Sequence, residues 1–307
     1  MPTPPPTLAF EVHEPEFESV LGDEPRLVKL ADVDAHEGPV YARAEHALYF
    51  TSLPPDARLK RLDVESGEIT VVRDDLVAPN GMTRERAGML VICEQGSTSE
   101  PARISALDLH TGELETLVDE WGGLALNSPN DVVVKSDGSV WFTDPSYGWL
   151  QGFRPEPEAG DHVYRYDPGS GRLTVVADSF EKPNGIAFSP DEQTLYVTDS
   201  GANQEPGSFH PGLPHHIVAF ELRDGRHLGP GRLFAVINPG FPDGLKVDLR
   251  GRVYASSWRG VQVFNPAGDL IGEIHLPGAV NFAFGGPGGN VLYITADTAV
   301  WAAVLNH

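Results

Sequence analysis

The sequence predicts an all-β protein, a six-bladed β-propeller with four-stranded antiparallel blades around a central channel. The main observation is a pattern that occurs six times: a polar residue opens an apolar run, and a second strand-like run begins 10 or 11 residues later. A turn-rich β unit repeated in this way is the sequence signature of a radial repeat. Composition agrees, because 33 Gly and 27 Pro among 307 residues suit many short strands joined by turns.

The six repeats are located by their polar first residues, which we call the openers. The openers are Glu37, Asn80, Asn130, Asn184, Asp243 and Asn281. The second strands begin at Leu48, Leu90, Val140, Leu195, Val253 and Leu292. Equivalent positions of a radial repeat surround one axis, so we expect the openers to form a ring of carboxylate and amide oxygens at the mouth of the channel.

The third repeat shows how four strands fit into one blade. Its predicted strands are Asp131–Val134, Val140–Asp144, His162–Asp167 and Leu173–Ala177. The sixth repeat has too few residues for four strands. We therefore expect the segment before Glu37 to supply its outer strand, which leaves no free sheet edge.

The repeats run from Glu37 to Leu305 without a linker, so residues 1–307 are expected to form one domain, with residues 1–9 flexible.

The formal charge of −22 argues against nucleic acid and anionic membranes as partners. No apolar run approaches the roughly 20 residues that span a bilayer. The start MPTPPPTLAF lacks the basic and apolar regions of a signal peptide. We expect a soluble cytoplasmic protein, either a monomer or a small homo-oligomer.

Two long loops follow second strands, at Tyr147–Asp161 and Gly201–His215. A second strand returns to the face of the openers, so both loops are expected to cover the ring as lids. The residues considered for substrate or lid contacts are Asn80, Tyr147, Trp149, Asp199 and His215.

The second strands themselves end in a further polar set, Glu94, Asp144, Asp199 and Ser257. These side chains could orient ligands or meet substrate, or they could cap turns, and the sequence leaves both interpretations open.

Four openers are candidate metal ligands: Glu37, Asn130, Asn184 and Asp243. Carboxylate and amide oxygens are hard donors that suit Ca²⁺, Mg²⁺ or Mn²⁺. The single cysteine, Cys93, lies in a predicted second strand (LVICE) and not among the openers. No His pair has zinc-ligand spacing. Asn-Gly and Asp-Gly are also ordinary turn dipeptides, but a turn role alone does not explain the Glu at position 37.

Four segments, EGPVY, SPNDVVVKSDGSVWFTDPSYG, PNGIAFSPDEQTLYVTDS and PDGLKVDLRGRVYAS, together resemble the SMP-30/gluconolactonase family, which includes regucalcin and bacterial aldonolactonases. The resemblance implies a six-bladed propeller with one divalent ion, held at positions that match Glu37, Asn184 and Asp243. It also implies that Asn130 faces the ion or the substrate and that Asp243 is the general acid and base. In one departure, Ser128 stands where animal members have an arginine that contacts the sugar.

The expected function is metal-dependent hydrolysis of a sugar lactone, an aldono-1,4- or 1,5-lactone, with Asp243 as the catalytic residue. Calcium is the first choice of ion, and Fe²⁺, Zn²⁺, Mn²⁺ and Mg²⁺ remain open. Two alternatives remain: a phosphotriesterase of the diisopropylfluorophosphatase type, and a non-catalytic calcium-binding propeller.

Overall fold

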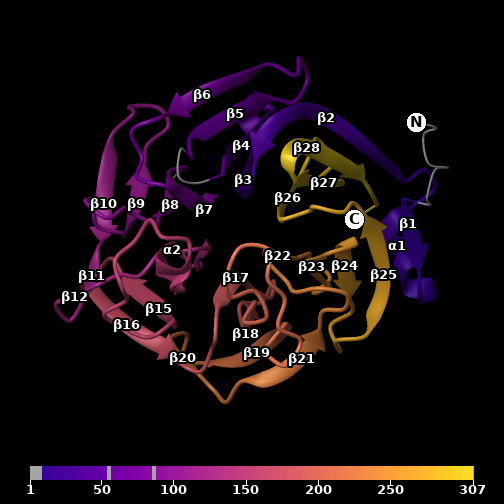
Figure 1. Cartoon of the computed structure of the whole chain (residues 1–307). Coiled ribbons are helices and arrows are strands. Elements are labelled where there is room, and N and C mark those ends of the chain that lie inside the picture. The colour runs from indigo at the N-terminus through magenta and orange to yellow at the C-terminus, as the bar shows by residue number, and fades with distance from the viewer. Residues whose placement is uncertain (1–8, 54–56, 85–87, 307) are drawn as a thin grey trace.

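The predicted propeller is confirmed by a computed structural model, which describes residues 9–53, 57–84 and 88–306. The predicted flexible segment 1–9 falls almost entirely on residues outside these ranges. In the described part, six sheets of four or five strands surround a central axis (Figure 1). Each sheet is one blade, and the first three strands of each blade follow one another outwards in chain order.

The strand bounds are as follows. The first blade contains β3 (Glu37–Ala42), β4 (Ala47–Thr51), β5 (Leu59–Asp63) and β6 (Ile69–Arg73). The second contains β7 (Pro79–Arg84), β8 (Leu90–Glu94), β9 (Arg103–Leu107) and β10 (Leu114–Val118). The third contains β13 (Val132–Val134), β14 (Val140–Asp144), β15 (His162–Asp167) and β16 (Arg172–Ala177). The fourth contains β17 (Pro183–Phe188), β18 (Thr194–Asp199), β19 (His216–Arg223), β20 (His227–Leu228) and β21 (Arg232–Val236). The fifth contains β22 (Leu245–Val247), β23 (Val253–Ser257), β24 (Gly260–Phe264), β25 (Leu270–His275) and β1 (Phe10–Val12). The sixth contains β26 (Asn281–Gly285), β27 (Val291–Thr295), β28 (Asp297–Val304) and β2 (Arg26–Ala35).

The core lies between the blades, with one apolar cluster at each of the six blade interfaces in the described chain. For example, Trp141 of β14 belongs to the same cluster as Ile186 of β17 and Val197 of β18. The second strands β4, β8, β14 and β23 are buried along their whole length. A strand covered on both faces needs apolar residues on both faces, which explains continuous runs such as LYFT and LVICE.

The N-terminal segment closes the ring, as predicted, because β2 pairs antiparallel with β28 of the last blade. The additional strand β1, which the sequence did not predict, pairs with β25 of the fifth blade. Between the two strands, η1 (Pro15–Phe17) and α1 (Glu18–Leu21) bury Phe17 and Val20 in the cluster between the fifth and sixth blades. The segment therefore joins two blades.

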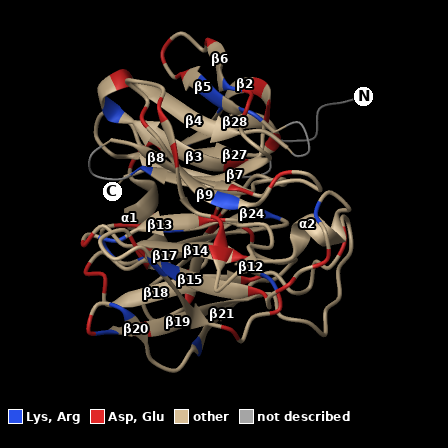
Figure 2. Cartoon of the chain, turned by 90° about the vertical axis from the view of Figure 1, so that its left-hand side faces the viewer, with Lys and Arg blue, Asp and Glu red and all other residues tan. Residues whose placement is uncertain are grey.

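The connecting segments differ from the predictions only locally. The predicted inner strand Asp131–Val134 begins one residue later, and the predicted strand Leu173–Ala177 begins one residue earlier. The first long loop begins with α2 (Tyr147–Leu150), and the second blade is followed by a hairpin of β11 (Glu120–Trp121) and β12 (Leu124–Ala125). A short 3₁₀ turn, η2 (Arg43–Glu45), joins β3 to β4. In the side view, α2 stands at one edge of the molecule (Figure 2).

The acidic residues are distributed over many turns and loops on the side shown in Figure 2, not gathered on one element. None of the helices in the described ranges has the length and apolar character that crossing a membrane would require.

Candidate active site

The openers are held in a ring by glycines that let neighbouring blades approach closely. The N–H of Gly81 donates to the carbonyl of Asn130 over 2.8 Å, and the N–H of Gly185 donates to the carbonyl of Asp243 over 3.1 Å. A Cβ at Gly81 would lie 2.3 Å from that Asn130 oxygen, closer than any real contact. The Gly that follows Asn80 and the Gly that follows Asn184 are therefore required for contact between blades, and this explains these Asn-Gly dipeptides better than a turn does.

Threonines of the second strands add a further bond between blades. A hydroxyl of one blade donates to the carbonyl of the next opener in three places: Thr51 to Asn80 over 3.0 Å, Thr143 to Asn184 over 2.6 Å, and Thr198 to Asp243 over 3.0 Å. The backbone of these openers is thus fixed by the preceding blade.

A cavity of about 260 Å³ lies over the ring. It is lined by five openers, by both long loops and by the adjacent segments: Glu37, Asn80, Asn130, Asn184, Asp243, Tyr147, Gln151, Asn203, Pro206, His36, Leu53 and Gln95. The structure therefore brings together the four predicted metal ligands, Asn80 and one predicted lid residue, Tyr147. The sixth opener, Asn281, is fully buried and does not line the cavity.

Three opener oxygens at this cavity are buried without a hydrogen-bond partner, Glu37 Oε1, Asn130 Oδ1 and Asn184 Oδ1, and so is Asn203 Oδ1 of the second long loop. Buried polar atoms are nearly always bonded, so three such oxygens around one space call for a ligand. The other oxygen of Glu37, Oε2, accepts hydrogen bonds from Gly38 N and Asn281 Nδ2, both over 2.8 Å. These bonds fix the carboxylate, so that Oε1 is the oxygen available to a cation.

Asn80 differs from the other openers that line the cavity. Its Oδ1 accepts a hydrogen bond from Gly81 N over 3.0 Å. Asn80 therefore contributes a wall of the cavity with its oxygen already bonded.

Burial and neighbouring negative charges oppose the ionisation of both carboxyls of the ring. Burial, followed by the charges of Asp243 and Asp131, raises the pKa of Glu37 to about 8. Burial also raises the pKa of Asp243 to about 7, against the lowering effect of its hydrogen bond with Asn184. A divalent cation would remove this conflict, because an opposite charge favours the ionised form of both groups. The residues present therefore fit such an ion.

Some cavity residues were not predicted from the sequence, namely His36, Leu53, Gln95, Gln151, Asn203 and Pro206. His36 Nδ1 lies 2.8 Å from Asp297 Oδ1 of the last blade. Burial lowers the pKa of His36, but the bond to Asp297 and the charge of Glu37 outweigh it and raise the pKa overall. The only sequence signal for His36 is its position beside an opener, whereas Gln151 and Asn203 lie in loops that have no equivalent in the other repeats.

Three predicted substrate or lid residues do not line the cavity. Trp149 on α2 is 45% exposed. Asp199 is buried, and its carboxylate accepts backbone N–H bonds from Glu181, Lys182 and Gly201. His215 Nδ1 lies 2.8 Å from the carbonyl oxygen of Ile237. Each of these side chains has contacts within the protein or with solvent that keep it away from the cavity.

The remaining strand-end residues are also bonded internally. Glu94 accepts from Val77 N and from Arg103, and Asp144 accepts from the N–H groups of Asn127 and Ser128. Of the two interpretations that the sequence left open, these contacts favour the second, in which the side chains hold turns and loops in place; we call this a bracing role.

Ser128 has a structural role as well. Its hydroxyl donates to the carbonyl of Pro145 over 2.6 Å and accepts from Gly148 N over 2.9 Å. The residue that replaces the sugar-contacting arginine of animal members therefore secures the start of the first long loop.

Known proteins resemble this chain along most of its length. Residues 35–298 match the family model described as the SMP-30/Gluconolactonase/LRE-like region. A gluconolactonase of Zymomonas mobilis is 29% identical over 305 residues, covering 92% of this chain and 82% of that protein. A lactonohydrolase of Aspergillus oryzae is 29% identical over 302 residues, covering 87% of this chain and 67% of that protein.

Solved structures agree. The structure of a gluconolactonase from Xanthomonas campestris superposes with a TM-score of 0.84 at 36% identity, covering 96% of this chain and 94% of that one. The structure of a calcium-binding protein, regucalcin, from Agrobacterium tumefaciens superposes with a TM-score of 0.71 at 19% identity, covering 92% of this chain and 94% of that one. At this identity, the similarity supports the fold alone. The chain belongs to the SMP-30/gluconolactonase/LRE-like family.

Proposed function

We propose that this protein uses one divalent cation to hydrolyse a sugar lactone in the cavity over the opener ring. The broad activity, lactonase-type hydrolysis of a carboxylic ester, follows from the family and from the gluconolactonases and lactonohydrolase among its relatives. The observation that supports the metal is the set of three buried oxygens without partners beside two carboxyls with raised pKa values.

Glu37, Asn184 and Asp243 would hold the cation, and Asn130 would complete its coordination or bind the substrate. All of these donors are oxygens, so calcium is our first choice. When bound, the cation would polarise the lactone carbonyl and make a nearby water more acidic.

The chain's own groups divide the remaining work. Asp243 is the member of this set suited to proton transfer, since amides do not titrate and Glu37 is fixed by Gly38 and Asn281. Asp243 would accept the proton of the attacking water and return it to the ring oxygen that leaves as the lactone opens.

The upper wall of the cavity would bind the sugar. Tyr147, Gln151 and Asn203 present a phenol and two amides, which can donate to and accept from sugar hydroxyls. The volume of about 260 Å³ is just below the range of about 300–1,000 Å³ for drug-sized ligands. A single small sugar lactone is therefore the expected size of substrate.

Metal analysis of the purified protein, combined with a substrate panel, tests the proposal. The panel contains gluconolactone, xylonolactone and an organophosphate triester, each assayed with calcium and with a chelator. We expect calcium-dependent opening of at least one lactone. Faster hydrolysis of the triester would favour the phosphotriesterase alternative, and no metal-dependent turnover of any ester would favour a non-catalytic propeller.

A further inference from the structure

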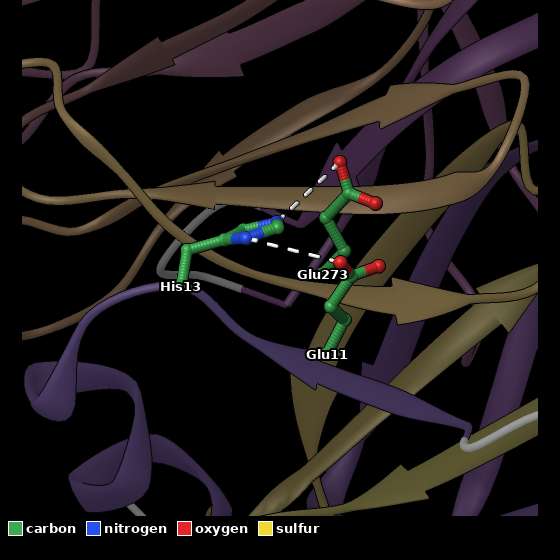
Figure 3. A group of neighbouring side chains, drawn as sticks. All are labelled: Glu11, His13 and Glu273. Carbon is green, nitrogen blue, oxygen red and sulfur yellow. Dashed lines mark ion pairs between the residues drawn. The ribbon is translucent and has the colours of Figure 1, made fainter.

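A second group of metal-binding side chains lies at the outer edge of the fifth blade, away from the cavity. Glu11 of β1 and His13 come from the N-terminal segment, and Glu273 and His275 come from β25. One ligand atom from each of Glu11, His13 and Glu273 lies within 4.8 Å of the other two. Figure 3 shows the His13 ring facing both carboxylates. We call these four residues the edge cluster.

The strand pairing puts two like charges directly opposite each other. In the register of β1 and β25, Glu11 faces Glu273. Like charges in this position destabilise a strand pair. Arg259 Nη1 lies 3.5 Å from Glu273 Oε2, but its side chain is 54% exposed, and such pairs contribute little. Arg259 therefore offsets little of the repulsion between the Glu11 and Glu273 carboxylates, and a further cation between them would stabilise the strand pair.

Both histidines approach the same two carboxylates. His275 Nε2 lies 3.0 Å from Glu11 Oε2 and 3.3 Å from Glu273 Oε2, and this buried nitrogen has no hydrogen-bond partner. His13 Nδ1 lies 4.0 Å from Glu11 Oε1, and its Nε2 lies 4.0 Å from Glu273 Oε1. Zinc bonds of about 2.0–2.1 Å place tetrahedral ligand atoms about 3.4 Å apart. The observed separations lie on both sides of that distance.

A neighbouring amide orients the most buried member of the edge cluster. Gln262 Nε2 donates to Glu273 Oε1 over 2.7 Å and to the carbonyl of Asn238 over 2.9 Å. Glu273 is only 2% exposed, so its carboxylate is held in one orientation, with Oε2 3.3 Å from His275 Nε2. Outer partners of this kind are typical of metal-ligating carboxylates.

We propose that the edge cluster binds one Zn²⁺ or a similar late first-row divalent ion and thereby fastens the N-terminal segment to the fifth blade. Mixed nitrogen and oxygen donors suit such an ion, whereas the oxygens of the cavity suit calcium. The two sites are separate, since β25 lies three strands outside β22, or about 14 Å at the usual spacing of about 4.8 Å.

The site would act where the ring closes. The strand β1 has only three residues, and the chain continues from it to Phe17, which is buried between the fifth and sixth blades. A short edge strand is weakly held by its backbone bonds alone. Metal binding would therefore stabilise the segment that connects these two blades.

Zinc binding to the full-length protein, titrated with zinc chloride and counted by elemental analysis after dialysis, tests this proposal. The Glu37→Ala/Asp243→Ala variant should still bind one zinc at the edge cluster. His13→Gln/His275→Gln should lose at least about tenfold in zinc affinity, since even outer-shell changes typically cost about 10–100-fold. The same variant should keep calcium binding and lactone hydrolysis, and His110→Gln, which changes an exposed histidine, should behave as wild type.

Amide exchange supplies the second measurement. Zinc should slow exchange at Phe10–Val12 in the wild type and leave it unchanged in the His13→Gln/His275→Gln variant. Unchanged zinc affinity in that variant, or absence of zinc from a folded Glu37→Ala/Asp243→Ala variant, would overturn the proposal. If the double histidine variant does not fold, Glu11→Gln gives the same comparison at a side chain that is 42% exposed.

Discussion

Two sets of acidic and amide side chains lie at the same end of the propeller and differ in how their oxygens are bonded. The openers Glu37, Asn130 and Asn184 each keep one buried oxygen without a partner. The strand-end carboxylates lie across the strand pairs from the openers, as Pro79 beside Asn80 faces Glu94, and Pro183 beside Asn184 faces Asp199. In contrast, both carboxylate oxygens of Glu94, Asp144 and Asp199 accept hydrogen bonds.

The difference separates a binding role from a bracing role. A carboxylate that accepts two or three backbone N–H groups holds a loop in place and has little capacity left for a ligand. An oxygen buried without a partner costs free energy unless something binds it. Residue type is therefore a poor guide to role at this end of the molecule, and hydrogen-bond saturation is a better one.

The largest effect that tests this contrast is expected at Asp243. Asp243→Asn keeps the shape and one oxygen donor but removes the titratable group. General acid–base assistance is typically worth about 10²–10⁴ in rate, so kcat should fall at least about a hundredfold, close to 3 kcal/mol of barrier. Activity should be expressed per bound ion, because the variant could also lose metal. Near-wild-type turnover per ion would move the base to another residue, with Glu37 as the next candidate at the cavity.

In the absence of metal, the free energy of unfolding should depend more on the strand-end carboxylates than on the openers. Asp199→Ala leaves the N–H groups of Glu181, Lys182 and Gly201 without their acceptor. Each unsatisfied buried group costs about 1–3 kcal/mol, so we expect a loss of about 3 kcal/mol of unfolding free energy in urea with a chelator present. Asn184→Ala should lose only about 1 kcal/mol, for its hydrogen bond with Asp243, since its Oδ1 has no partner to lose.

Calcium supplies the control for this comparison. Binding to the native state alone adds about 2.7 kcal/mol at a concentration of 100 times Kd. Asp199→Ala should gain this stabilisation as the wild type does, and Asn184→Ala should gain much less. Equal calcium stabilisation of both variants would contradict the assignment of Asn184 as a ligand.

A smaller effect is expected in the pH dependence of the metal-free protein. The folded-state pKa values of Glu37 (about 8) and Asp243 (about 7) lie above the ordinary values of 4.5 and 3.8. A raised carboxyl pKa means that the fold favours the protonated form. This contribution to stability is fully present below about pH 4 and is lost as pH rises through 7 to 8.

The wild type in chelator should therefore lose at least about 1.4 kcal/mol relative to Glu37→Gln/Asp243→Asn between pH 5 and pH 8, the equivalent of one pKa unit. The difference between the two proteins is the quantity to measure, because burial also raises the pKa of Asp144 to about 7. Saturating calcium should abolish the difference in slope. Parallel stability curves in chelator would show that the two openers are not coupled to folding.

The smallest effect concerns the first long loop. Gln151 lines the cavity, whereas Trp149, two residues earlier, is exposed. Gln151→Ala should raise KM for the preferred lactone about fivefold, the equivalent of one hydrogen bond of about 1 kcal/mol, with unchanged metal content. Trp149→Ala is the matched control and should leave KM unchanged. If Trp149→Ala has the larger effect, the loop contacts substrate through a different surface from the one described.

The fold was predictable because the same pattern recurs in every blade. The strands of the third repeat were predicted to within one residue, and the closing role of the segment before Glu37 was predicted from the short sixth repeat. The strand β1 was not predicted, because three residues have no counterpart in the repeat and pair with a strand more than 250 residues away along the chain.

The candidate site was predictable to the extent that it is part of the repeat. Glu37, Asn130, Asn184 and Asp243 line one cavity because they are openers. Asp199 could not be assigned from the sequence, since its role depends on N–H groups that a loop brings to it. Gln151 and Asn203 lie in loops specific to one blade, where no internal repeat exists to compare.

The glycine and threonine bonds between blades have a consequence for ion selectivity. Four opener backbones, those of Asn80, Asn130, Asn184 and Asp243, accept hydrogen bonds from a neighbouring blade, so the distances between these openers depend on the packing of the blades and not on one flexible loop. Calcium requires oxygens at about 2.3–2.6 Å, and magnesium requires them at about 2.0–2.1 Å. A ring that cannot contract by tenths of an ångström would exclude the smaller ion on size alone, so the packing between blades would set the radius of the ion that the proposed site accepts.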